Sequence, residues 1–278
     1  MRKLKEYLNR PLSFVMFLLI IISTVITALT VVFIIGYIFI KGVPNLSLDL
    51  FSLKYSSSNQ SMLPSIINTV YLTALTLLLS VPIGIFSAIY LAEYSRKNSF
   101  FVKIINIANE TLSGIPSIVY GLFGFLAFVI SKKWGYSLLA GVITLEIMVL
   151  PLIIRTSQEA MLGVDNTFRE ASYGLGAGKL RTVFKIVLPS AMPGILSGII
   201  LAIGRIVGET AALIYTAGTV PEAATKLTSS SRTISVHLYC LLNEGLYTKQ
   251  AYATAVVLIV FVVIINALSN ALAKKIMK

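Results

Sequence analysis

Long stretches of apolar residues without any charge run through the whole chain. Residues 12–40, 55–92 and 250–273 contain no Asp, Glu, Lys or Arg. A run of about 20 apolar residues forms a helix long enough to cross a bilayer, and soluble proteins rarely need several such runs. No segment alternates between apolar and polar residues over ten positions, as a strand of a membrane barrel would. The pattern predicts an all-α, polytopic membrane protein.

Six segments are predicted to span the membrane as helices, because lipid permits only helices or closed barrels. The first segment follows several basic residues, as in a signal peptide. It is too long for the apolar core of a signal peptide, however, and no clear small-residue cleavage site follows it. We therefore expect a retained anchor within a single transmembrane domain. The predicted spans are residues 12–40, 65–92, 112–131, 136–154, 192–217 and 250–273.

Composition and charge also predict how the chain is oriented in the membrane. Of the 278 residues, 56% are hydrophobic and 12% are charged, against roughly 25% charged in an ordinary soluble domain. Of the 23 lysines and arginines, 15 fall on the side of both termini and of the loop after the fourth span, and 7 fall on the other side. Cytoplasmic loops carry the excess of Lys and Arg, so both termini are predicted to be cytoplasmic. The net charge of +12 is thus mainly a topology signal, and no motif indicates a nucleic-acid partner.

The longest predicted cytoplasmic loop, residues 155–190, is the least apolar of the loops on that side. Helix-forming residues precede Gly174, and three glycines at alternate positions up to Gly178 predict a bend. A second short helix is expected to end at Pro189, with an apolar stripe at helical spacing that includes Phe184. Two short helices of this kind could form a projection that docks on a partner protein. They could equally lie as an amphipathic helix on the lipid headgroups.

A glycine-rich stretch of this loop resembles a nucleotide-binding P-loop, but only superficially. A P-loop needs a glycine where Tyr173 stands, a Ser or Thr where Leu180 stands, and a preceding strand. The sequence therefore predicts no ATP site in this chain.

The same loop resembles the EAA loop of ABC-importer permeases, in which Glu-Ala-Ala is followed at fixed spacings by Gly, Ile and Leu-Pro. Ser172 replaces the second alanine, which is a small-for-small change. The resemblance implies a type I importer permease with a MetI-like bundle of six spans, whose loop inserts into a groove of a separate ATPase dimer. That partner would bind ATP and Mg²⁺, so this chain would have no catalytic residue and no cofactor. The matching residues are Glu170, Ala171, Gly176, Ile186, Leu188 and Pro189.

Arg205 and Glu209 stand in the fifth predicted span, four residues apart, so that on a continuous helix they would share one face. Ionisable groups inside a span are costly and usually face a cavity or a partner. Two interpretations stay open. The residues could form a mutually neutralising pair that locks helix packing. Alternatively, the guanidinium could be an anion station whose fork matches phosphate-type oxygens, with Glu209 limiting the affinity and Thr210 adding a hydrogen bond.

The fifth span is also similar to phosphate-specific ABC-importer permeases of the PstA type, in which an Arg, three residues and Glu-Thr-Ala recur. Residues 114–124 and 150–156 agree, and the similarity runs from about residue 64 to 274. The resemblance implies a bacterial or archaeal plasma-membrane importer of inorganic phosphate that works by alternating access. It also implies a sister permease of the PstC type and an extracytoplasmic phosphate-binding protein. Arg155 becomes a second candidate for handling phosphate, against its simpler interpretation as a positive-inside anchor.

Three other functions are alternatives to phosphate import. An ABC importer of the same type could carry another oxyanion, such as molybdate, sulfate or phosphonate. An ion-coupled secondary transporter would leave the docking loop unexplained, and an intramembrane enzyme would need a nucleophile–base or metal constellation that the spans lack. Cys240 and His237 have no Asp or Glu directly beside them that could complete a set of metal ligands, so no metal site is predicted. Glu146, inside the fourth predicted span, has no evident partner in the sequence.

Overall fold

The computed structural model describes residues 11–96 and 99–276, and these are almost entirely helical, with no strand among them. Five of the described helices are long and apolar enough to cross a membrane, and a bent pair would make a sixth span. The prediction of an all-α membrane protein is therefore confirmed. Several basic residues behind the predicted orientation lie outside the described residues, namely Arg2, Lys3, Lys5, Arg10, Lys97 and Lys278.

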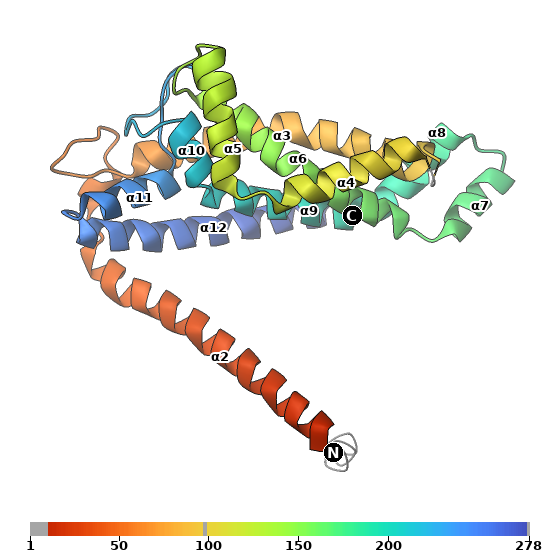
Figure 1. Ribbon diagram of the computed structural model, residues 1–278, viewed down its shortest axis with the longest axis horizontal. Helices are drawn as coiled ribbons and strands as arrows, with labels where there is room; N and C mark the ends of the chain where they lie inside the picture. Colours follow the sequence, from red (N-terminus) through yellow and green to blue (C-terminus); the bar gives the residue numbers. More distant parts are fainter. Residues whose placement is uncertain (1–10, 97–98, 277–278) are drawn as a thin grey trace.

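Four long helices form the bundle, and α6 lies at its centre (Figure 1). Leu145 and Ile153 of α6 are fully buried and pack in one apolar cluster with Leu72 of α3 and Ile206 of α9. Helix α6 therefore has packed neighbours on more than one side. This explains why apolar residues occur almost all round the helix instead of in a single stripe. The four helices are α3 (Leu63–Ile89), α6 (Leu138–Leu162), α9 (Leu188–Gly208) and α12 (Thr248–Ile276).

Helices α6 and α9 approach each other closely through glycines. A Cβ added at Gly198 of α9 would collide with the side chain of Thr156, and one added at Gly194 would lie 2.6 Å from the Cβ of Ala160. Small residues allow helices to pack at short distance. Since higher numbers on α9 face lower numbers on α6, the two helices run antiparallel.

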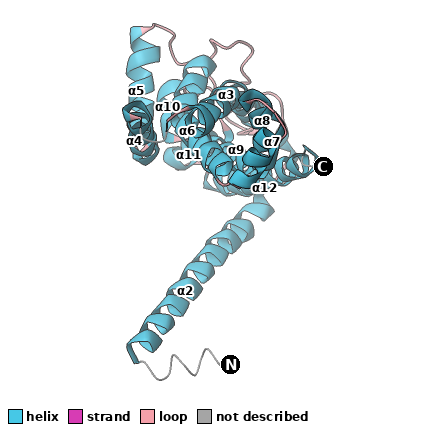
Figure 2. Cartoon of the chain, turned by 90° about the vertical axis from the view of Figure 1, so that its right-hand side faces the viewer, coloured by secondary structure: helices cyan, strands magenta, loops and turns pink. Residues whose placement is uncertain are grey.

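The first long helix, α2 (Pro11–Gly42), leaves the bundle and extends away from it (Figures 1 and 2). It contacts α12 only near its end, where the rings of Tyr37 and Tyr252 lie 5.9 Å apart and Gly42 packs on the backbone of Tyr252. No part of its most apolar window is buried within the chain. The first predicted span thus forms one long apolar helix, whose sides are open to lipid or to another chain.

The third predicted span, residues 112–131, is not one straight helix in the structure. The structure has α4 (Phe100–Gly114), then α5 (Ser117–Gly124) continued by the π-helical segment η4 (Phe125–Ser131), with a bend of 101° between α4 and the rest. Pro116 causes the bend, because proline has no N–H to donate and keeps the preceding residue out of the helical region. Ile115 accordingly is extended, with φ −71° and ψ 132°.

The fifth predicted span, residues 192–217, is also interrupted. Helix α9 ends at Gly208, Glu209 is extended with φ −70° and ψ 132°, and a short helix, α10 (Ala211–Thr216), follows. The continuous helix assumed from the hydropathy of this segment is therefore broken at Glu209 and Thr210.

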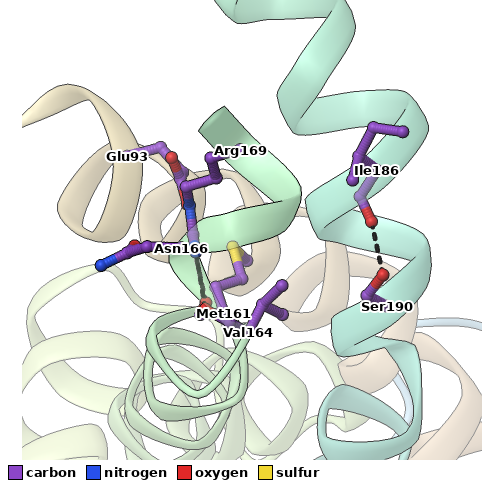
Figure 3. Close-up of polar contacts among 7 residues, drawn as sticks. All are labelled: Glu93, Met161, Val164, Asn166, Arg169, Ile186 and Ser190. Atoms are coloured by element: carbon purple, nitrogen blue, oxygen red, sulfur yellow. Dashed lines mark hydrogen bonds and ion pairs between the residues drawn. The ribbon is translucent and has the colours of Figure 1, made fainter. Parts of the chain in front are cut away.

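The expected helix end at Pro189 is wrong as well. Helix α8 (Lys179–Thr182), the π-helical turn η5 (Val183–Val187) and α9 follow one another without a break. Pro189 is tolerated because it stands in the first turn of α9, directly after the register change of the π turn. Directly after the proline, the Ser190 hydroxyl donates to the carbonyl oxygen of Ile186 at 2.7 Å (Figure 3).

The cytoplasmic loop is shorter than the predicted residues 155–190, since α6 continues to Leu162. It contains the helix α7 (Asn166–Gly174). The segment between α10 and α12 contains the helix α11 (Ile234–Glu244), and one of its faces is buried in the protein. The segment between α2 and α3 forms the short 3₁₀ turns η1 (Val43–Asn45) and η2 (Leu48–Phe51).

Replacing Gly198 by alanine should destabilise the bundle by about 1–3 kcal/mol, because the new Cβ overpacks the contact with Thr156. The change would appear as a lower midpoint of thermal unfolding in detergent. Gly204→Ala on the same helix is the matched control, since nothing lies within 4 Å of a Cβ there. It should keep or raise the midpoint, because alanine is the better helix former. Equal midpoints for the two variants would contradict the close contact of α6 and α9.

Candidate functional site

A knob built from α7, α8 and the turn between them projects from one end of the bundle (Figure 1). Several of its large apolar side chains face outward: Leu175 is 89% exposed, and Phe168 and Leu180 are exposed by more than half. Clustered apolar side chains without cover mark an interaction surface. The knob is therefore the part of the cytoplasmic loop that is suited to contact a partner protein.

The six motif residues do not all lie on the knob. Glu170, Ala171 and Gly176 are exposed there. Ile186 and Leu188 are half-buried at its base, where Leu188 packs against the cluster that includes the fully buried Val183 and Val187. Pro189 is exposed in the first turn of α9. The structure thus separates the predicted docking residues into three on the knob and three that join it to the membrane helices.

The turn of the knob depends on one of its three glycines. Gly176 has a φ of +81°, a conformation that side chains rarely adopt, whereas Gly178 has an ordinary φ of −71°. Backbone hydrogen bonds close the turn, from Gly176 to the carbonyl of Tyr173 at 2.9 Å and from Ala177 to that of Ser172 at 3.1 Å. The bend predicted from alternating glycines is confirmed, and Gly176 is the position that requires glycine.

Polar side chains hold the two helices of the knob in place. Asp165 precedes α7 and accepts hydrogen bonds from the backbone N–H of Thr167 at 2.9 Å and from its hydroxyl at 3.0 Å. These bonds lower the pKa of Asp165, the backbone bond contributing most. The hydroxyls of Ser172 and Thr182 are buried and lie 2.8 Å apart, which joins α7 to α8. Ser172, the departure from the motif, is thus part of a contact that alanine could not make.

Arg169 anchors the knob to two other helices, a role that the sequence did not reveal. Its Nη2 and Nε lie 2.7 and 3.1 Å from Oε1 of Glu93, in the π-helical turn η3 (Tyr90–Tyr94) that ends α3 (Figure 3). It also donates to the carbonyl oxygens of Met161 at 2.8 Å and Val164 at 2.6 Å, at the end of α6. The last carbonyls of a helix lack partners within the helix, and a cation there also suits the helix dipole. Because Glu93 and Arg169 stand 76 residues apart, no spacing rule could have paired them.

Arg205 and Glu209 do not form the pair that their spacing predicts. The helix ends between them, and Oε1 of Glu209 instead accepts hydrogen bonds from the backbone N–H groups of Thr210 and Ala212, both at 3.1 Å. The Glu209 side chain is turned into the break, where only 8% of the residue is exposed. Thr210 lies in the same break, and its hydroxyl is 3.4 Å from the carbonyl oxygen of Gly208. The carboxylate thus satisfies backbone donors that the break leaves open.

Arg205 is half-buried in the last turn of α9. Its charge acts on the buried hydroxyl of Tyr120 on α5, which itself donates to the carbonyl of Leu112 at 2.7 Å. Within the described part of the chain, no hydrogen bond or ion pair holds the guanidinium. The interpretation as a locked, mutually neutralising pair therefore loses its geometric basis.

Arg155 lies inside α6 rather than at its end. Its Nε is 2.9 Å from Oε1 of Glu159, and both side chains are more than half exposed. They face a cleft of about 170 Å³ between α4 and α6. The antiparallel contacts of α6 and α9 place Arg205 opposite Val149, about six residues or roughly 9 Å along the helix from Arg155. The structure therefore does not bring the two arginines into one site. The other lining residues are Asn106, Asn109, Glu110, Gln158 and Leu162.

The outer loops are held together by a buried cluster around His237. This residue is fully buried on α11, and its ring lies edge-on to Tyr55 at 6.4 Å. The Arg232 guanidinium stacks on the same tyrosine at 4.7 Å. Burial, and next the charge of Arg232, lower the pKa of His237 to about 3, so the ring is neutral at physiological pH. Among the described residues, no group of three or more His, Cys, Asp or Glu could hold a metal ion.

Curated relatives resemble this chain over most of its length. A phosphate transport system permease protein, PstA, of Pasteurella multocida is 33% identical over 275 residues, which cover 95% of this chain and 93% of that protein. A PstA of Haemophilus influenzae is 34% identical and covers 78% of this chain and 77% of its own length. A probable ABC transporter permease protein, YqgI, of Bacillus subtilis is 32% identical over 83% of this chain and 84% of that protein.

Solved structures show the same fold at lower sequence identity. A bacterial ABC transporter involved in the import of the acidic polysaccharide alginate matches with a TM-score of 0.68, 18% identity and full coverage of both chains. An inward-facing MetNI methionine ABC transporter matches with a TM-score of 0.59 and 17% identity over 77% of this chain and 94% of that chain. The predicted MetI-like permease bundle is thereby confirmed. Residues 80–278 match the family described as binding-protein-dependent transport system inner membrane component, and the chain belongs to this family.

Proposed function

We propose that this chain is the membrane-spanning permease subunit of an ATP-driven importer of inorganic phosphate. The observation that carries the proposal is the similarity to phosphate transport permeases along almost the entire chain, at 33% identity over 95% of its length in one case. The chain would form the translocation pathway together with a sister permease. It would receive phosphate from an extracytoplasmic binding protein and carry out no covalent chemistry itself.

Arg205 is the residue that we expect to contact phosphate within the membrane. Its guanidinium has no acidic partner in the described residues, and a planar fork of donors matches phosphate oxygens. Glu209 would act indirectly, because its carboxylate holds the break beside Arg205, and Thr210 could offer its hydroxyl at the same break. Arg155 would be a second, weaker contact nearer the cytoplasm, since Glu159 competes for its charge.

The knob would dock into a groove of the ATPase dimer, which binds ATP and Mg²⁺. Its exposed apolar side chains and the exposed Glu170 favour a protein partner over a lipid surface, because the knob projects beyond the ends of the spanning helices (Figure 1). The three motif residues at its base would pass the movement of the knob to α9. ATP hydrolysis would then switch the pathway between its two openings.

Both termini are proposed to be cytoplasmic, in the plasma membrane of a bacterium or an archaeon. The beginning of α2 and the end of α12 point toward the end of the bundle that carries α7, as Figure 1 shows. If the knob meets a cytoplasmic ATPase, these helix ends lie on the cytoplasmic side. The excess of Lys and Arg on that side agrees.

Two alternatives make different predictions. A permease for another oxyanion would keep the same architecture, but the relatives named above as phosphate transport proteins favour phosphate. An ion-coupled secondary transporter would work without an ATPase, and the exposed knob would then have no function.

Arg205→Gln should reduce uptake of radiolabelled phosphate by the reconstituted complex about tenfold or more, because a charge-assisted contact is worth about 1.5–3 kcal/mol. Arg205→Lys keeps the charge but not the fork, so its uptake should be intermediate. Gly204→Ala, one residue away in open space, is the control and should transport normally. Unimpaired uptake by Arg205→Gln would reject the role of Arg205, whereas wild-type uptake of molybdate or sulfate in preference to phosphate would reject the substrate.

Gly176→Ala should weaken both the co-purification of the ATPase and phosphate uptake, because alanine at a φ of +81° costs about 1–2 kcal/mol and distorts the knob. Gly178→Ala is the matched control, since Gly178 stands in the same turn with an ordinary φ and open space around it. If both variants bind the ATPase and transport like the wild type, the knob is not the docking element.

A tag fused after Lys278 should be accessible to a protease or an antibody only in inside-out vesicles, because the positive-inside pattern puts this terminus in the cytoplasm. Right-side-out vesicles from the same cells serve as the control. A tag that is accessible only from outside would overturn the proposed orientation.

A further inference from the structure

The knob is covalently continuous with two membrane helices, but it touches a third. Its beginning follows α6, and its end leads through η5 into α9. Helix α3 lies far away in the sequence, yet its last turn, η3, contacts both halves of the knob. A movement of the knob therefore reaches α6 and α9 through the backbone, and it reaches α3 only through side chains.

The contact from α7 is a buried ion pair between Arg169 and Glu93. Only 13% of the Arg169 side chain and 6% of the Glu93 side chain are exposed. Nε and Nη2 of the guanidinium donate to the same carboxylate oxygen of Glu93. Nη2 also donates to the carbonyl of Met161, and Nη1 donates to that of Val164. One side chain thus joins the ends of α3 and α6 to α7. Removing one partner of such a pair leaves a buried charge without compensation.

The contact from α8 reaches the same turn of α3. The Lys179 Nζ lies over the ring of Tyr94, 4.9 Å from its centroid. Because the buried Ser172–Thr182 hydrogen bond joins α7 to α8, the two halves of the knob are fastened to each other as well as to η3. The turn η3 is π-helical, a geometry that is rare in helices and frequent at functional sites.

We propose that the Arg169–Glu93 ion pair is the link through which the knob moves α3 together with α6, so that ATP hydrolysis is coupled to the rearrangement of the pathway. The two residues are positioning residues, since neither is proposed to touch phosphate or ATP. The inference rests on the proposed function, because it needs an ATPase that displaces the knob. It adds α3 to the helices that respond and names the side chains that carry the displacement.

The test compares Glu93→Gln, Arg169→Gln and the double variant in the complete complex, reconstituted into vesicles with its ATPase, sister permease and binding protein. The readout is phosphate taken up per ATP hydrolysed, which a purely structural role would not change in complexes that assemble normally. Each single variant should lower this ratio about fivefold or more, and the double variant should be no worse than either, because all three break the same link. Asn166→Ala is the control: it removes an exposed partner of Arg169, 3.3 Å away, and keeps the ion pair, so its ratio should equal that of the wild type.

A second measurement decides the question if the variants fail to assemble. Spin labels at Arg96 and Asn166, in a complex whose Cys240 is replaced by serine, report the distance between the end of α3 and α7. With ATP bound or absent this distance should stay constant, while the distance from each label to a third label at Lys274 changes.

Assembled variants with the wild-type ratio, or a wild-type Arg96–Asn166 distance that changes with ATP, would overturn the proposed link. A wild-type complex that takes up no phosphate with ATP would instead overturn the proposed function, and the label distances would still report on the link. The two failures are therefore distinguishable.

Discussion

The structure depends on one constraint: a backbone group inside a bilayer must find its hydrogen-bond partner within the protein. At several helix ends and breaks among the described residues, a side chain binds backbone groups that the helix leaves free. At the end of α9, the Glu209 carboxylate accepts from the two N–H groups that the break exposes. At the end of α6, Arg169 takes two carbonyl oxygens. Some of the polar residues of the chain therefore serve the backbone where helices break or end.

This constraint changes the role that Glu209 has in the fifth predicted span. As half of a helical ion pair, Glu209 would have neutralised Arg205 and made the span inert. Because the carboxylate is used by the backbone, Arg205 keeps its charge within the described chain, half-buried and near Tyr120. A half-buried cation without an acidic partner costs free energy within a membrane unless an anion binds to it or a second subunit provides a partner. An importer of an anion can use such a cation, since the contact needs to be transient.

The end of the bundle that carries α7 and α8 shows how an exposed surface is joined to membrane helices. The knob exposes apolar side chains at its tip, and its root combines a buried apolar cluster with a buried ion pair. Glycine at a positive φ shapes the tip, while an ion pair and a hydroxyl pair hold the root. A buried, bonded root and an exposed tip suit the proposed transmission of movement by the knob.

The sequence by itself determined the class of protein, the number and approximate place of the apolar helices, and the loop with Glu170 and Gly176, because hydropathy and motif spacing are local properties. Only the tertiary structure decided where the helices break. The hydropathy of residues 112–131 and 192–217 is the same whether the chain is straight or bent, and Pro116 and Glu209 act through backbone geometry. The partners of Arg169 and Glu209 likewise could not be predicted from the sequence. A side chain 76 residues away, or a carboxylate turned toward its own backbone, depends on packing that no spacing encodes.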